Sequence, residues 1–309
     1  MLKAHSSQLI SHQHTIRIKN IAVIGAGTMG NGIAHVFAQY GFSVTLTDID
    51  EAALGKAIET ISKNADRQVS KGIITQATKD SILSTLHTST SIETGVVKAD
   101  LVIEAATENK AVKLKIFKEL DAFAPPSCIL ATNTSSISIT AIAAVTGRAE
   151  KVIGMHFMNP VPVMKLVEVI NGYATAKEVT SEVVYITQQL DKIPCIVNDY
   201  PGFIANRILM PMINEAIYSL YEGVAGIEEI DTVMKLGMAH PMGPLQLADF
   251  IGLDICLSIL KILYEGFGNP KYAPCPLLVN MVTASKLGIK SGEGFYKYTP
   301  GSKEQVPAF

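Results

Sequence analysis

The chain has 309 residues, a formal net charge of −2 at pH 7, and a composition that is 48% hydrophobic and 17% charged. This size and composition suit a compact globular protein of one large or two ordinary domains. The near-neutral charge argues against a nucleic-acid-binding protein and against attraction to acidic membranes. No apolar stretch is long enough to span a bilayer, and the best candidate, residues 257–264, is interrupted by Lys261, so we expect no membrane protein.

The first 17 residues, 1–17, differ from the rest of the chain. No acidic residue occurs before position 20, and three of the seven histidines lie there. This segment is either a disordered terminal extension, the simpler interpretation, or a weak organelle-targeting leader. We therefore expect a cytoplasmic protein, with the mitochondrial matrix as the alternative. Four scattered cysteines form no CxxC pair and indicate buried thiols in a reducing compartment, not disulfides or zinc: Cys128, Cys195, Cys256 and Cys275.

The first ordered segment predicts a dinucleotide-binding turn. An apolar strand, 21–24, precedes GAGTMG, in which Gly25, Gly27 and Gly30 form a GxGxxG pattern at the start of a helix. The first glycine permits a tight turn, the second lets a pyrophosphate approach the backbone, and the third lets helix and strand pack closely. Free N–H groups at a helix start bind phosphate. The alternative is a glycine turn without a ligand.

A second strand, 44–47, ends in Asp48. A carboxylate at this place accepts hydrogen bonds from the adenosine ribose and repels the additional phosphate of NADP. The following residues, DIDEAALGK, include no arginine that would bind that phosphate. The sequence therefore predicts NAD, not NADP, as the cofactor.

Strands and helices then alternate along the chain. Residues 51–72 and 109–123 have helical spacing, and residues 101–104 and 128–131 are apolar strands. Such alternation predicts a doubly wound parallel sheet, which binds ligands at the carboxyl ends of its strands. The loops ATEN and TNTSS follow two of these strands and are candidate binding loops. TNTSS is also typical of an ordinary helix N-cap.

The stretch GMHFMNPVPVMKLVEV contains one histidine in apolar surroundings. Two strands, 151–157 and 163–170, flank an Asn-Pro turn. If these strands pair as a hairpin, His156 and Glu168 lie near each other. A carboxylate beside an imidazole fixes its tautomer and stabilises the imidazolium that forms when it takes a proton. The two residues are either a catalytic base with its partner or a buried core pair.

Beyond Pro201 and Gly202 the pattern changes to helices without a convincing strand. We therefore predict two domains, 18–201 and 202–309. The second contains a helix pair with many apolar residues, which form either its own core or a subunit contact: Leu245, Leu247, Phe250, Ile251, Ile255, Leu257, Ile259, Leu260 and Leu263.

A basic stripe lies on the predicted helix 51–72. Lys63, Arg67 and Lys71 are spaced four residues apart and share one helix face. The stripe is either a solvated surface or a contact for an anionic ligand.

Eight motifs occur in the order seen in 3-hydroxyacyl-CoA dehydrogenases, so the chain resembles that family over residues 18–298. They are GAGTMGNGIAHV, Asp48, EAATENKAVK, NTSS, HFMNPVPVMKLVEV, PGFIANRI, HPMGPLQLADFIGLD and KSGEGFYKY. The resemblance implies an N-terminal Rossmann-type domain and a helical C-terminal domain that mediates a homodimer. It also implies NAD-dependent, reversible oxidation of (S)-3-hydroxyacyl-CoA in fatty-acid β-oxidation or butanoate metabolism. Multifunctional members carry an additional hydratase domain, for which this chain has no room, so we expect a stand-alone member. The resemblance also implies a preference for short-chain substrates.

The resemblance also implies residue roles. His156 matches the catalytic base and Glu168 its partner. Ser135 and Asn206 match groups that hold the substrate, and Lys71 is a candidate for the 3′-phosphate of coenzyme A. Further positions match cofactor-binding residues, alongside the glycines and Asp48: Glu108, Lys113, Ser135, Asn159 and Lys290. No metal is expected.

Two other functions remain open from the sequence. One is a related NAD enzyme that oxidises a small hydroxy acid such as a sugar acid, because such relatives share the HFxNP motif. The other is a non-enzymatic binding or lens-type structural protein on the same scaffold. Because such a protein is expected to lose His156 or Glu168, and both are present, this function ranks last.

Overall fold

The computed structural model describes residues 18–299 and 305–309. The predicted extension, residues 1–17, lies outside the described residues. The chain divides into two compact units: residues up to Thr134 with Ile139–Ile196, and Ser135–Ser138 with Val197–Phe309. The short segment Ser135–Ser138 thus belongs with the second unit. Our boundary between residues 201 and 202 stays a prediction of where the domains separate.

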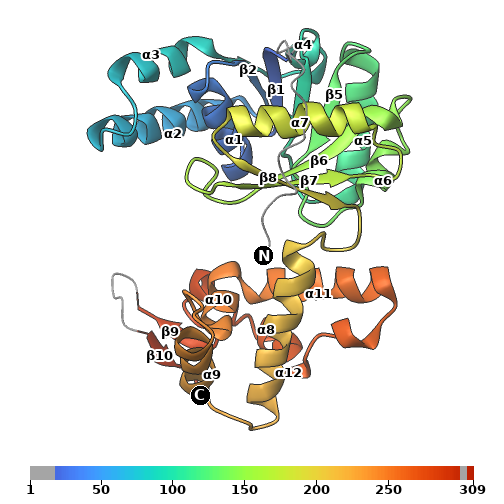
Figure 1. The fold of residues 1–309 in the computed structure, drawn as a ribbon. Coiled ribbons are helices and arrows are strands. Elements are labelled where there is room, and N and C mark those ends of the chain that lie inside the picture. The colour runs from blue at the N-terminus through green and yellow to red at the C-terminus, as the bar shows by residue number, and fades with distance from the viewer. Residues whose placement is uncertain (1–17, 300–304) are drawn as a thin grey trace, which may run out of the picture. The chain divides into compact units, whose positions relative to one another are not determined.

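The first unit is built on one eight-stranded sheet (Figure 1). The strand order is β3-β2-β1-β4-β5-β6-β7-β8, with parallel pairing from β3 to β6 and an antiparallel pair β6–β7. The predicted doubly wound sheet is confirmed. The strands are β1 Asn20–Ile24, β2 Ser43–Thr47, β3 Leu86–Ser89, β4 Leu101–Glu104, β5 Ile129–Thr132, β6 Val152–Phe157, β7 Leu166–Asn171 and β8 Ile193–Asn198.

Helices connect these strands and pack around the sheet (Figure 1). Local capping fixes where two of them begin: Asp50 accepts a hydrogen bond from Ala52 N at 2.9 Å, and Asn109 accepts one from Val112 N at 3.1 Å. The helices are α1 Thr28–Gln39, α2 Glu51–Ser70, α3 Gln76–Thr85, α4 Ile92–Val96, α5 Lys110–Phe123, α6 Ile139–Ala143 and α7 Lys177–Gln189.

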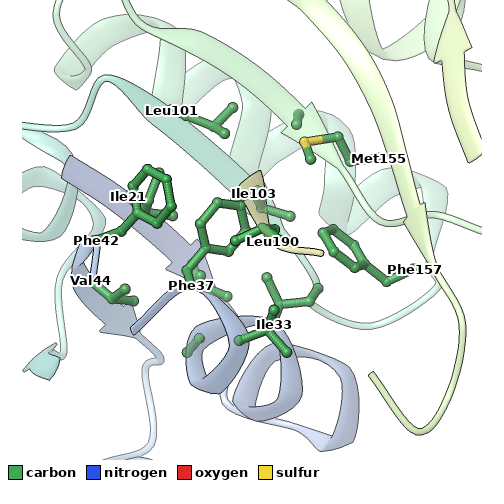
Figure 2. Packing of buried hydrophobic residues seen from close by; sticks show 14 of the residues in the cluster. Ile21, Ile33, Phe37, Phe42, Val44, Leu101, Ile103, Met155, Phe157 and Leu190 are labelled. Atoms are coloured by element: carbon green, nitrogen blue, oxygen red, sulfur yellow. The ribbon is translucent and has the colours of Figure 1, made fainter. Parts of the chain in front are cut away.

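The core of this unit lies between α1 and the sheet (Figure 2). Ile33 and Phe37 of α1 are fully buried, and Phe37 packs edge-on against Phe42 and Phe157 with ring centroids 5.5 and 6.5 Å away. Figure 2 shows Phe37 surrounded by side chains of several strands. This packing holds the start of α1, and therefore the glycine turn, firmly against the sheet.

α1 also buries a histidine. His35 has no exposed surface, and within the described residues neither ring nitrogen has a hydrogen-bond partner. Burial lowers its pKa from 6.5 to about 4, because the charged imidazolium is poorly solvated there, and the nearby Gln68 side chain opposes this decrease. The folded protein therefore holds His35 neutral at pH values where the unfolded chain already binds a proton.

This difference predicts a stability loss in acid. Between pH 6.5 and 4 the unfolded state binds the extra proton, so the free energy of unfolding falls as the pH is lowered through this window. At pH 5 the His35 contribution amounts to a loss of about 2 kcal/mol relative to pH 7.5. Urea unfolding of the wild type and of His35→Leu at both pH values measures it, with the leucine variant showing the smaller loss. Equal losses in both proteins would contradict the assignment.

The second unit is mainly helical. α8 packs against α9, α10, α11 and α12, and α8 and α11 both contribute buried side chains to the core. The helices are α8 Ala205–Tyr221, α9 Ile227–Thr232, α10 Pro244–Ile251, α11 Leu253–Phe267 and α12 Pro276–Thr283. Short 3-10 turns lie in both units, at Ala149–Lys151, Pro270–Tyr272 and Ile289–Ser291, and a π-helical turn lies at Val233–Gly237.

The helical character of this unit is confirmed, but our expectation that it has no strand is wrong. β9 Tyr296–Tyr298 and β10 Gln305–Pro307 form a small antiparallel pair. Buried Asp249 holds the first of these strands by accepting from Phe295 N at 3.0 Å and Tyr296 N at 2.9 Å. Buried Asp231 accepts from the Tyr296 hydroxyl at 2.9 Å. Three-residue strands held by side chains leave no periodic signal in the sequence.

The apolar residues of the α10–α11 pair serve mainly the core of their own unit. Leu245, Leu260 and Leu263 are fully buried, whereas Phe250 is 66% exposed and Ile255 is 45% exposed. The prediction of buried thiols is wrong for one cysteine, since three are buried but Cys195 is exposed on β8. Of the helices in the described part of the chain, none is long and apolar enough to cross a membrane.

Candidate active site

The glycine turn has the geometry that its sequence predicts. Gly25 has a φ of +101°, a conformation that side chains disfavour, and a Cβ there would lie 2.7 Å from the carbonyl oxygen of Ala105. A Cβ on Gly30 would lie 1.7 Å from the carbonyl oxygen of Gly25. Both positions therefore require glycine for the fold itself.

Gly27 is different, because a Cβ there would meet no atom within 4 Å. Its backbone angles, φ −66° and ψ −170°, are accessible to any residue. It is the N-cap of α1, and no side chain within the described residues caps this end of the helix. The open space and the uncapped N–H groups of α1 suit a pyrophosphate.

Asp48 lies at the end of β2 beside this turn. Its Oδ2 accepts from Ala26 N at 2.7 Å, and its Oδ1 accepts from Asp50 N at 3.0 Å, so the carboxylate is held in one orientation. It lines a cavity of about 720 Å³ together with the glycine turn, Ile49 and the loop that follows β4. Ile49 is 92% exposed and offers an apolar surface for a planar ring. The residues present fit the adenosine half of NAD.

β6 and β7 bring the histidine and the glutamate together. The two strands are antiparallel, with His156 directly opposite Glu168. Nδ1 of His156 lies 2.8 Å from Oε2 of Glu168, and the two residues are 8% and 2% exposed. Because a carboxylate accepts hydrogen bonds, Nδ1 carries the proton and Nε2 has the lone pair of a base. The expected proximity is confirmed, while the catalytic role stays a prediction.

A buried polar network lies at the carboxyl ends of β4 and β5. Lys113 is 1% exposed, and its Nζ donates to both carboxylate oxygens of Glu104 at 2.7 and 2.9 Å. Thr132 also donates to Glu104, at 2.7 Å. Glu108 accepts from the hydroxyl of Thr134 at 2.6 Å and lies 3.6 Å from Lys113. Lys113 thus organises the loop, and its contact with the cofactor, like that of Glu108, stays a prediction.

Three other predicted site residues belong to the second unit. The Asn206 side-chain amide donates to the carbonyl oxygen of Ser135 at 3.1 Å, so these two predicted substrate residues are in contact. Lys290 donates to the Asp254 carboxylate at 2.6 Å. Its predicted role at the cofactor stays a prediction.

A second cavity, of about 440 Å³, also borders the glycine turn and shares Gly27 and Thr28 with the first. Asn159 lines this cavity, and its peptide bond to Pro160 is cis. The sequence analysis did not find two polar residues of α2 that also line it, Lys56 and Asn64. Asn64 lies eight residues after Lys56 and seven before Lys71, so the three residues share one side of the helix and its end. This spacing could have revealed Lys56 and Asn64.

The predicted basic stripe on α2 is an exposed surface. Lys63 is 67% exposed along its side chain and pairs with Glu59 at 2.5 Å. Lys71 caps the end of α2 and is exposed. Neither lines the cavity that contains Lys56.

Comparison with known protein families finds one family that matches both units of the chain. Residues 20–200 match the NAD-binding domain of 3-hydroxyacyl-CoA dehydrogenase, and residues 202–298 match the C-terminal domain of the same family. The chain belongs to the 3-hydroxyacyl-CoA dehydrogenase family. It is therefore an NAD-dependent oxidoreductase, and the resemblance read from the eight motifs is confirmed.

The relatives of this 3-hydroxyacyl-CoA dehydrogenase cover nearly its whole length. A probable 3-hydroxybutyryl-CoA dehydrogenase of Bacillus subtilis is 54% identical, over 92% of this chain and 98% of the relative. The human mitochondrial hydroxyacyl-coenzyme A dehydrogenase is 43% identical, over 95% of each chain. The crystal structure of (S)-3-hydroxybutyryl-CoA dehydrogenase from Ralstonia eutropha is 50% identical, with a TM-score of 0.90 over 91% of this chain and 99% of that one.

Proposed function

We propose that the protein interconverts short-chain (S)-3-hydroxyacyl-CoA, such as 3-hydroxybutyryl-CoA, and the corresponding 3-oxoacyl-CoA. The main support for this proposal is the buried His156–Glu168 pair, in which the histidine can accept a proton and the glutamate can balance the resulting charge. The pair lies in the same unit as a glycine turn of the type that binds NAD. Oxidation of a secondary alcohol requires such a base, because the hydroxyl proton must leave as the hydride does.

The residues of the chain then have distinct tasks. The glycine turn and Asp48 would hold NAD, which would supply the hydride acceptor for carbon 3 of the substrate. Nε2 of His156 accepts the hydroxyl proton, and Glu168 offsets the positive charge that develops on the ring. Ser135 and Asn206 hold the reacting oxygen or the thioester at the correct distance and angle. In the reverse direction, the imidazolium of His156 returns its proton to the ketone oxygen.

The cavity beside α2 is proposed to receive the coenzyme A arm. Lys56 supplies a cation for a phosphate group, and Asn64 supplies an amide that can donate and accept hydrogen bonds. Lys71, farther along the same helix face, is proposed to contact the 3′-phosphate. Lys56 is exposed where it lines the cavity, so it attracts an anionic ligand without the cost of burying a charge.

A substrate series tests this function. The wild type is expected to oxidise NADH with acetoacetyl-CoA, more weakly with the pantetheine thioester that lacks the nucleotide phosphates, and not with free acetoacetate. NADH absorbance gives each kcat/KM. Lys56→Ala should lower kcat/KM for acetoacetyl-CoA about tenfold, equivalent to about 1.4 kcal/mol, and leave the pantetheine thioester unaffected.

The control for this series is Lys98→Ala, which removes an exposed cation away from the cavity. Turnover of a free hydroxy acid or keto acid in place of the thioester would favour the alternative, a dehydrogenase of small hydroxy acids such as sugar acids. NADH binding without turnover of any of these substrates would contradict both functions.

A homodimer formed through the helical unit is also proposed. Its support is the exposure of large apolar side chains on that unit, among them Phe250 at 66% and Leu236 at 82%. Sedimentation equilibrium would give the mass, and a monomer at all concentrations would contradict it. The cytoplasm remains our prediction for the compartment, because the bacterial relative shares more residues with this chain than the human mitochondrial one.

A further inference from the structure

We infer that Lys192 is a positioning residue that holds the turn 160–164 in place as a wall of the proposed coenzyme A cavity. This inference rests on the proposed function, because it assigns Lys192 to the binding of the thioester. Lys192 follows α7, thirty-six residues after His156 in the sequence, and no motif of the sequence analysis includes it. It is nevertheless 7% exposed, which is unusual for a lysine.

The ammonium group of Lys192 binds the turn directly. Its Nζ donates to the carbonyl oxygen of Val161 and to the carbonyl oxygen of Met164, both at 2.7 Å. Burial lowers its pKa from 10.5 to about 8, with nearby Lys165 adding to the decrease and Asp191 opposing it. At neutral pH the group therefore remains mostly protonated and keeps its three N–H donors.

The turn needs this cation because the N–H groups within it donate to Pro160, which leaves the carbonyl groups of Val161 and Met164 to a donor outside the turn. Val163 N and Met164 N both donate to the carbonyl oxygen of Pro160, each at 2.9 Å, so residues 160–164 form a single tight turn. The carbonyl oxygens that point out of such a turn carry partial negative charge, as they do at a helix C-terminus. Lys192 satisfies two of them at once.

Two more contacts join the same segments. Ile193 N donates to the carbonyl oxygen of Lys165 at 2.8 Å, and the Lys165 side chain pairs with the carboxylate of Asp191. The residues 191–193 therefore clamp both the end of the turn and the start of β7. Because β7 carries Glu168, the clamp fixes the whole connection between His156 and its partner.

The turn is also the wall of the cavity. Pro160, Val161 and Pro162 line it together with Lys56 and Asn64. Val161 is 2% exposed and packs so closely on α1 that a Cβ on Gly32 would lie 2.9 Å from it. Val161 thus lies between α1 and the Lys192 ammonium, and loss of the ammonium frees the turn to move away from the cavity.

The test compares two substitutions of Lys192 by steady-state kinetics and NADH fluorescence titration. Lys192→Met keeps the length and removes every donor, so KM for acetoacetyl-CoA is expected to rise about tenfold, the scale of a lost buried hydrogen bond on an equilibrium constant. The Kd of NADH is expected to stay within about twofold, because the adenosine cavity does not include the turn. Lys192→Arg, which keeps donors, should restore most of the affinity.

The matched control is Lys177→Met, an exposed lysine at the start of α7, the helix that precedes Lys192, and it should leave all constants unchanged. Asp191→Asn is a second variant on the protein surface, so it should fold even where Lys192→Met does not. Asn tolerates the φ of +53° at this position. It weakens the clamp by one ion pair, and KM for acetoacetyl-CoA should rise about twofold.

Four outcomes decide the inference. A higher KM for the thioester with unchanged NADH binding supports it. A folded Lys192→Met with the wild-type KM, or an equal loss of NADH and thioester binding, overturns it, as does an unfolded Lys192→Met together with an unchanged KM in Asp191→Asn. A wild type that does not turn over acetoacetyl-CoA overturns the proposed function instead, so the two failures are distinguishable.

Discussion

His156→Gln is expected to lower kcat for the reduction of acetoacetyl-CoA by about 10³-fold, within the range that general acid–base groups contribute. Glutamine keeps a similar size and a hydrogen-bonding group near Glu168 but cannot exchange a proton at neutral pH. The Kd of NADH should stay unchanged, because the cavity that fits the adenosine half of the cofactor does not include His156. Stopped-flow NADH absorbance and fluorescence titration measure the two quantities.

Glu168→Gln is the comparison for this variant. It keeps the contact with Nδ1 but removes the negative charge that stabilises the imidazolium, so kcat should also fall, by about 10²-fold. The double variant should be little worse than His156→Gln alone, since the two residues act as one unit. Wild-type kcat in His156→Gln would exclude it as the base and leave the pair a structural feature of the core.

Two glycine substitutions are expected to separate folding from cofactor binding. Gly30→Ala places a methyl group 1.7 Å from the Gly25 carbonyl oxygen, so the backbone must shift and the protein should lose at least about 3 kcal/mol of stability. Gly27→Ala meets no protein atom within 4 Å, so its stability should be that of the wild type. Its Kd for NADH should nevertheless rise at least about tenfold, because the methyl group occupies the approach of the pyrophosphate.

Thermal unfolding and NADH titration on both variants give the readout. Gly55→Ala, in the middle of α2 with open space around the site, is the control and should be neutral or slightly stabilising. A destabilised Gly27→Ala, or one that binds NADH as the wild type does, would contradict the placement of the pyrophosphate over this residue.

The sequence predicts the central strands of the fold better than its edges. β1, β4 and β5 are short apolar runs between helices, and the sheet buries them on both faces, so their pattern is strong. β3 and β8 were not predicted. β3 is LHTS, with one apolar residue, and β8 contains Pro194, which argues against a strand. Both lie at the edges of the sheet, where burial no longer selects apolar residues.

The candidate site divides in a similar way. The sequence predicted the site residues that belong to short local motifs. The glycine turn and Asp48 at the end of a strand are recognised from the spacing of neighbouring residues alone. Lys56 was missed although its spacing on α2 could have revealed it. Glu104 and Lys192 were not found, since each acts through partners that the fold brings close. Glu104 accepts a hydrogen bond from Thr132, 28 residues away in the sequence, and Lys192 donates one to Val161, 31 residues away. A single sequence contains no record of such distant contacts.

The antiparallel pairing of β6 with β7 also determines how this enzyme tolerates changes in length. Five residue pairs fix the alignment of the two strands, and His156 faces Glu168 in the fourth of them. All five pairs lie within the strands, so a residue added to the connecting turn does not change the spacing of His156 or Glu168 within its own strand. One residue added within either strand would place Met155 or Phe157 opposite Glu168 and turn the imidazole to the other face of the sheet. Evolution can therefore reshape the substrate cavity through the connecting turn while the proton-transfer pair stays in alignment.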